Sequence, residues 1–203
     1  FKDRTRPAIG NHDARTIGAA AYYDFFGDNA GTPGEGWYSS DIENWQVIVL
    51  NSECGADGLA PCSSQNAWLV DDLASNSQLC MLAYWHKPVF NSGRHSGHVA
   101  FADEWATLDE AGVDLVLNGH DHNYQRYAPQ NSMGQPTQTG MRQFVVGSGG
   151  AKLYEQSTVA SNLEEFYQGY GVLKLELSAA TYNWEFISTE GTYTDEGGGV
   201  CGP

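Results

Sequence analysis

The chain has 203 residues, a mass of 22.1 kDa and a formal net charge of −15 at pH 7, because 25 acidic residues face only ten basic ones. Such a chain lacks the basic surface that nonspecific nucleic-acid binding requires, so no nucleic-acid partner is expected. An apolar content of 41% is typical of a globular protein. No run of about eighteen apolar residues exists, so neither a membrane span nor a membrane partner is expected.

Short apolar runs alternate with helical patterns along the chain. Residues 15–26 predict a helix, which a Gly-rich loop follows. Continuous apolar runs predict buried strands, and helical patterns with apolar residues on one face lie between them. The expected strands cover residues 45–50, 79–85, 113–117 and 144–146, and the expected helices run from Ser63 or Ser64 to about Ala74 and over 101–111. This alternation predicts an α/β fold with a sheet covered on both faces.

The last part of the chain has a different pattern. Residues 171–177 and 182–188 alternate between apolar and polar and predict an antiparallel pair. Residues 197–199 are all glycine and predict a flexible tail that Cys201 anchors.

Polar clusters follow two of the predicted strands directly. His86 comes after one strand, and the segment 118–122 comes after the next. Ligands of open α/β sheets bind at the carboxyl ends of the strands. We therefore expect these two clusters to lie close together at one edge of the sheet.

Four cysteines are present, and an even count suits two disulfides with three possible connectivities. Cys54 and Cys62 flank a short loop and are candidates for a local pair, which would leave Cys80 and Cys201 to tie the tail to the body. The alternative is four reduced cysteines in the core. Disulfides fit an oxidising compartment, so a secreted, extracellular location is expected.

The histidines gather in three short clusters, and none lies in a predicted helix. They are His12, His86, His95, His98, His120 and His122. A lone histidine is more often structural than functional, but this clustering favours a site. His120 and His122 stand two residues apart, so on extended backbone they would point the same way and reach one metal ion or two adjacent ions. Such an ion would also let an acidic chain bind an anion.

The ordered set of motifs resembles the calcineurin-like metallophosphoesterase superfamily, and most closely its purple acid phosphatase-like secreted branch. The matching segments are Gly10-Asn11-His12-Asp13, Tyr84-Trp85-His86-Lys87-Pro88 and Gly119-His120-Asp121-His122-Asn123-Tyr124. The segment Asn91-Ser92-Gly93-Arg94-His95 is similar to the family's substrate loop. The likeness extends to about Ser188. It implies a metallophosphoesterase four-layer α/β sandwich, here a single domain over residues 1–203.

The resemblance implies a centre of two divalent or trivalent metal ions. Asn11, His86 and His120 would bind one ion, and His122 would bind the other. Two such cations clamp an anionic phosphoryl group, and the nucleophile would be metal-bound hydroxide. These ligand types suit zinc, iron or manganese. The substrate would be a phosphorylated small molecule, a phosphate monoester with diesters as a second class.

The resemblance also implies roles for the remaining site residues. His12 would lie beside the substrate phosphate and protonate the leaving group or stabilise the transition state, and Asp13 would orient it. His95 would contact the phosphoryl oxygens, with His98 assisting. One departure is visible, because Ser96 follows His95 where some family members have a second histidine.

Two upstream family motifs that supply aspartate ligands have no counterpart before Gly10, where Asp3 is the only acid. The chain, which starts at Phe1, is therefore expected to be N-terminally truncated, to lack its first strands and to hold an incomplete second metal site. Three interpretations stay open. The chain is the downstream part of an active enzyme associated with its missing segment, a catalytically inactive structural or binding module that self-associates through an exposed sheet edge, or a weak single-metal hydrolase.

Overall fold

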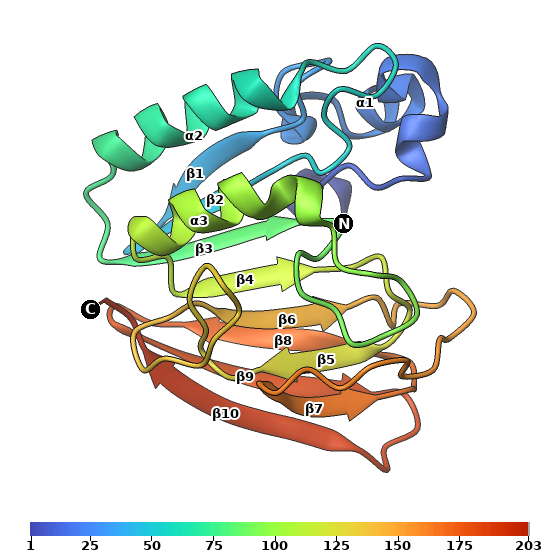
Figure 1. Ribbon diagram of the computed structural model, residues 1–203. Coiled ribbons are helices and arrows are strands. Elements are labelled where there is room, and N and C mark those ends of the chain that lie inside the picture. Colours follow the sequence, from blue (N-terminus) through green and yellow to red (C-terminus); the bar gives the residue numbers. More distant parts are fainter. Residues whose placement is uncertain (203) are drawn as a thin grey trace.

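The computed structural model describes residues 1–202 and contains two β-sheets and three α-helices (Figure 1). The larger sheet consists of β1 (Tyr38–Ile42), β2 (Trp45–Val49), β3 (Cys80–Trp85), β4 (Leu115–Asn118), β5 (Tyr124–Tyr127), β6 (Arg142–Val146) and β7 (Leu163–Tyr167). The smaller sheet consists of β8 (Gly171–Leu177), β9 (Thr181–Ser188) and β10 (Thr194–Val200). The α-helices are α1 (Ala20–Phe26), α2 (Cys62–Ser75) and α3 (Ala102–Glu110). The four buried strands and both long helices expected from the apolar runs are confirmed.

The elements stack in three layers (Figure 1). Helices α2 and α3 cover one face of the larger sheet, and the smaller sheet packs on the other face. The α/β class is confirmed, because both long helices follow strands of the larger sheet. The helices and the two sheets make three of the four expected layers in residues 1–202. Over the same residues, no helix combines the length and the apolarity that crossing a membrane requires.

Strand direction decides where the polar clusters lie. The larger sheet has the order β1-β2-β3-β4-β6-β5-β7, and β2, β3, β4 and β6 run parallel to one another. The carboxyl ends of β3 and β4 therefore meet at one edge, where Gly119 N donates a hydrogen bond to His86 O at 3.0 Å. The expected proximity of the two polar clusters is confirmed.

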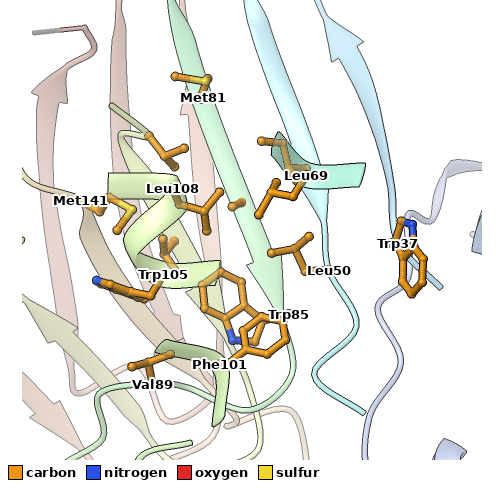
Figure 2. Close-up of a cluster of buried hydrophobic side chains, with 14 residues drawn as sticks. Trp37, Leu50, Leu69, Met81, Trp85, Val89, Phe101, Trp105, Leu108 and Met141 are labelled. Carbon is orange, nitrogen blue, oxygen red and sulfur yellow. The ribbon is translucent and has the colours of Figure 1, made fainter. Parts of the chain in front are cut away.

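An aromatic core holds α3 on the larger sheet, as Figure 2 shows. Trp85 at the end of β3 packs against Phe101 and Trp105, with ring centroids 5.3 and 6.0 Å away. All three rings are at most 1% exposed. Burying such a side chain contributes about 1.5–3 kcal/mol or more, so this cluster fixes the strand end from which His86 projects.

The two disulfides are Cys54–Cys62 and Cys80–Cys201, which confirms the candidate local pair and the tie between the tail and the body. The second one ties the start of β3 to the end of the chain, across a sequence separation of 121 residues. It lies in the core between the two sheets, where both cysteines are at most 5% exposed.

The expected flexible tail is wrong, because residues 197–199 belong to strand β10. The three glycines pair with β9, where Trp184 and Tyr182 point into the core between the sheets. A Cβ at Gly197 would lie 2.6 Å from Trp184 Cη2, and one at Gly199 would overlap the Tyr182 ring. Glycine is therefore needed here for close packing on aromatic rings rather than for flexibility.

The single helix expected over residues 15–26 is also wrong. The structure has short 3-10 helices at Asp13–Arg15 and Ile17–Ala19, and α1 begins only at Ala20. Gly18 and Ala19 adopt positive φ values of 62° and 51°. The Gly18 amide donates a hydrogen bond to Asp57 O at 2.8 Å, so docking on the loop between Cys54 and Cys62 breaks the helix.

Candidate functional site

Three of the predicted metal ligands, two histidines and one asparagine, meet at the carboxyl edge of the larger sheet. His86 follows β3, His120 follows β4, and Asn11 comes from the N-terminal segment. His86 Nε2 lies 2.7 Å from Asn11 Oδ1 and 3.2 Å from His120 Nδ1. Donor atoms bound to one metal ion at about 2.0–2.2 Å lie at similar mutual distances. The structure therefore brings these three predicted residues together with the spacing of a shared ligand set.

Burial keeps both imidazoles of this group neutral. It lowers the pKa of His86 to about 3, with a further contribution from the neighbouring His120. It also lowers the pKa of His120 to about 4, and His95 adds to that effect. A neutral imidazole offers the lone pair that metal binding needs, so the environment favours the ligating form of both rings.

The backbone around His86 is closely packed. A Cβ at Gly10 would lie 3.2 Å from His86 Nδ1, and His120 adopts a φ of 66°, which is unusual for a residue other than glycine. The Asp121 amide donates to Gly119 O at 2.7 Å and closes the turn that holds His120 in this conformation. Strained backbone of this kind concentrates at functional sites.

His122 lies on the other side of this turn. Its Nδ1 is 2.7 Å from Lys152 O, and its ring stacks on Tyr154 with centroids 4.2 Å apart. A carbonyl can only accept, so Nδ1 carries the proton and Nε2 is free to bind a metal ion. The expectation that His120 and His122 point the same way assumed extended backbone, and the positive φ of His120 removes that basis.

The segment 91–95, which the sequence predicts to be a substrate loop, contacts a buried carboxylate. Asp121 is fully buried, and its Oδ2 accepts hydrogen bonds from the Asn91 side chain and, at 3.3 Å, from the His95 amide. Its Oδ1 lies 3.3 Å from His95 Nδ1. Both atoms are buried and neither has a hydrogen-bond partner in residues 1–202, so they face each other at close range without a hydrogen bond. Asp121 thus holds the backbone of His95 and faces its ring, whose centroid is 4.4 Å from that of His120.

Further buried polar side chains anchor the same loop to β5. Gln125 donates to Asn91 Oδ1 at 2.7 Å and accepts from the Ser92 amide at 2.9 Å. Tyr127 donates to the same Gln125 carbonyl at 2.6 Å. Ser92, Gln125 and Tyr127 are all 0% exposed. A satisfied buried network of this kind rigidifies the segment that it holds.

Tyrosine hydroxyls fix the segment that carries Asn11. Tyr22 and Tyr38 both donate to Pro7 O, at 2.9 and 2.8 Å, and Tyr84 of β3 donates to Arg6 O at 2.6 Å. These bonds tie the backbone before Asn11 to the same strand that leads into His86. The side-chain amide of Asn11 and the imidazole of His86 are therefore both positioned by β3.

His12, Asp13 and His98, the remaining predicted site residues, make fewer contacts with the other site residues. His12 is exposed, and Asp13 accepts a hydrogen bond from the Gly10 amide at 2.9 Å rather than contacting the His12 ring. His98 lies against Phe101, with ring centroids 6.2 Å apart, and burial lowers its pKa, with Lys87 adding to the shift. The structure does not bring His98 into contact with the rings of His95 and His120, and its part in substrate binding stays a prediction.

Comparison with known proteins identifies the family. The sequence profile of the calcineurin-like phosphoesterases matches residues 2–124, which is more than half of the chain. The chain belongs to the calcineurin-like phosphoesterase family. Metal ions are therefore implied at the site, and similarity to this family supports phosphoester hydrolysis in general.

Individual relatives agree with this membership. Purple acid phosphatase 18 of Arabidopsis thaliana is 27% identical over 170 residues, which cover 77% of this chain and 38% of that protein. An uncharacterized protein of Mycobacterium tuberculosis is 29% identical over 157 residues, covering 66% of this chain and 30% of the relative. The chain thus spans less than two fifths of the curated relatives that it matches.

A solved structure shows the same fold. The purple acid phosphatase PPD1 from seeds of yellow lupin, Lupinus luteus, superposes with a TM-score of 0.74 at 19% identity. The superposition covers 96% of this chain and 38% of that protein. The arrangement of sheets and helices is therefore that of a calcineurin-like phosphoesterase over nearly the whole chain.

The residues present suit one metal ion but not the full set of ligands for two. In the part of the chain that the structure describes, no three His, Cys, Asp or Glu side chains are placed to hold one ion. The group at the edge consists instead of two imidazoles and the amide of Asn11, whose carbonyl is a neutral oxygen donor. This donor set and its spacing fit one ion, whereas His122 alone is available for a second.

Sequence reasoning missed Tyr154 and Lys152, which position His122. They lie just after the turn at residues 147–150, which follows β6 at the same sheet edge. Their position after a predicted parallel strand could have identified them as site residues, because loops at the carboxyl ends of such strands reach the site. Asp121, which lies within the predicted Gly-His-Asp-His motif, also holds His95, and spacing alone did not indicate this.

Proposed function

We propose that this chain carries the downstream part of the active site of a metal-dependent phosphoesterase that hydrolyses phosphate monoesters, with diesters as a second substrate class. The observation that carries the proposal is the meeting of Asn11 Oδ1 and His120 Nδ1 at His86 Nε2, at 2.7 and 3.2 Å. Such a ligand set on a calcineurin-like fold suits hydrolysis of a phosphorylated small molecule.

In this proposal Asn11, His86 and His120 hold one metal ion, and His122 contributes to a second. Imidazole and amide donors suit zinc, iron or manganese. Bound ions would supply positive charge for the phosphoryl oxygens and an activated water as nucleophile. The chain's own contribution is to keep His86 and His120 neutral by burial, and to fix the ring of His122 through the Lys152 carbonyl and the Tyr154 ring.

Two further histidines complete the proposed chemistry. His95 contacts the phosphoryl oxygens through Nε2, while Asp121 faces its Nδ1 at 3.3 Å and favours the tautomer that leaves Nε2 outward. His12 is exposed at the edge and provides a proton for the leaving group. Asp13 supports it indirectly, because its carboxylate closes the turn that presents His12. The two disulfides support a secreted location.

The proposal is tested by metal content and hydrolysis measured on the same samples. We expect the desalted chain to retain at least one zinc, iron or manganese ion per 22.1 kDa in elemental mass spectrometry, and to hydrolyse p-nitrophenyl phosphate. Asn11→Ala should weaken metal retention about tenfold or more, since it deletes a ligand. Asn183→Ala, a matched change on the exposed face of β9, should retain metal as the wild type does.

A chain without metal and without hydrolysis would refute the proposal. It would favour the alternative of a catalytically inactive structural or binding module. Retention of metal that Asn11→Ala leaves unchanged would instead show that the ion binds elsewhere, and would refute the ligand assignment.

A further inference from the structure

A hollow of about 460 Å³ opens beside the candidate site. Apart from Gln168, its lining has two parts, Arg94 from the segment 91–95 and the segment 152–157, and we call these two parts its walls. Its volume falls in the range of about 300–1,000 Å³ that is typical of small-molecule sites. Tyr154 connects it to the site, because the Tyr154 ring stacks on His122 and its centroid is 5.2 Å from that of His95.

Hydrogen bonds tie the two walls of this hollow to each other. The amides of Ser157 and Thr158 donate to Ser92 O at 3.1 and 3.2 Å, and the Ser157 hydroxyl donates to Gly93 O. In addition, the Tyr154 amide donates to His122 O at 2.9 Å. The walls are therefore fixed relative to the metal-ligating turn, so a group bound between them would hold a defined position.

Two cations line the hollow without a carboxylate partner. The ion pairs found in residues 1–202 occupy Lys87, Arg126, Arg142 and Lys174. None of them involves Arg94 or Lys152, although Glu155 lines the same hollow. The Arg94 guanidinium instead lies 4.8 Å from the centroid of the Tyr154 ring. In a chain of net charge −15, two unpaired cations beside one site mark a local preference for an anion.

The rest of the lining is mainly polar. Hydrogen-bonding groups come from Gln156, Ser157 and Gln168. Among the residues that line the hollow, only Leu153 has an aliphatic side chain. Such a lining suits a charged group better than an apolar one. A guanidinium binds phosphate through two parallel N–H···O bonds, and a lysine adds a point charge.

We propose that Arg94 and Lys152 bind a second phosphate group, carried on the leaving group of the substrate, so that the preferred substrates are bisphosphates. The inference rests on the proposed function, because the scissile phosphate must lie at His95 and the metal ligands for the second phosphate to reach the hollow. It goes further by naming the substrate class and two residues that select it.

The test compares three esters of one carbon skeleton. These are 1,4-butanediol bisphosphate, 4-hydroxybutyl phosphate and 4-phosphooxybutanoate, which differ only in the distal group. We expect kcat/KM for the bisphosphate to exceed that for the hydroxy compound about tenfold, well beyond the factor of two from its two equivalent esters. Arg94→Gln and Lys152→Gln should each reduce this ratio about twofold, and the double variant should bring it close to two.

The ratio is the readout because a general loss of activity cancels in it. Lys174→Gln removes one positive charge on β8 in the smaller sheet and should leave the ratio unchanged. A second readout does not need catalysis. Calorimetric titration of the metal-free chain with 1,4-butanediol bisphosphate should give a Kd that rises about tenfold in the double variant.

The two proposals fail in different ways. Hydrolysis of the hydroxy compound with a ratio near two in every variant would overturn the second-phosphate site and leave the proposed function intact. An equal preference for the carboxylate compound would overturn the assignment to phosphate. Absence of all hydrolysis, with binding of the bisphosphate still weakened in the double variant, would refute the proposed function and support this site.

Discussion

Gly93 is a residue at which one added methyl group should damage the site. A Cβ there would lie 2.6 Å from Asn123 Nδ2 and closer still to Asp121 Oδ2. Ordinary contacts begin near 3.4 Å, so the loop must retreat by at least about 0.8 Å. The carboxylate cannot yield, because Asp121 is fully buried and bonded to the Asn91 side chain.

The cost of Gly93→Ala follows from two contributions. Overpacking a filled interior costs about 1–3 kcal/mol. Weakening a charge-assisted hydrogen bond, here the one between Asn91 and Asp121, costs about 1.5–3 kcal/mol. We expect the free energy of unfolding to fall by about 3 kcal/mol. Because the His95 amide also bonds to Asp121, kcat/KM should fall about tenfold as His95 shifts.

Urea denaturation followed by tryptophan fluorescence measures this change, and Gly149→Ala is the matched control. A Cβ at Gly149 would meet nothing within 4 Å, although Gly149 lies in a loop at the same sheet edge. The control should therefore stay within about 0.5 kcal/mol of the wild type. If Gly93→Ala is as stable as Gly149→Ala, the argument that the loop is clamped on a buried carboxylate is refuted.

Two further predictions concern stability. Burial lowers the pKa of His86 to about 3, from the usual value of 6.5. The neutral His86 ring therefore contributes fully to the stability of the metal-free chain above pH 6.5, and this contribution is lost as the pH falls toward 3. The free energy of unfolding should fall by up to about 1.4 kcal/mol per pH unit across that window, and His86→Gln should flatten this slope; an unchanged slope would contradict the burial argument. Replacing both cysteines of Cys80–Cys201 with alanine should cost about 5 kcal/mol, against about 2.5 for Cys54–Cys62, because the sequence separations are 121 and 8 residues. Denaturation midpoints in the reverse order would count against the loop-closure account.

Strands that are buried on both faces were predictable from the sequence, and others were not. The runs that became β2, β3 and β4 are apolar except for Gln46 and the terminal Asn118, and parallel strands between two layers have that composition. β5 reads Tyr-Gln-Arg-Tyr, and it was missed because its polar side chains are satisfied by partners distant in sequence. Arg126 of β5, for example, forms an ion pair with Asp195 of β10 at 2.7 Å, which no local pattern indicates.

The candidate site divides in the same way. Chain order and strand direction were enough to predict that His86 and His120 would meet, since each follows a parallel strand of the same sheet. The directions of the His120 and His122 side chains depend on the positive φ of His120. The periodicity of the sequence does not predict this backbone conformation. The turn that produces it sends His122 toward Tyr154 and so toward the hollow of Arg94 and Lys152. In the proposed site, the loop after β6 therefore supplies Lys152 and Tyr154 beside Arg94, whereas the candidate metal ligands come from the ends of β3 and β4 and from the N-terminal segment.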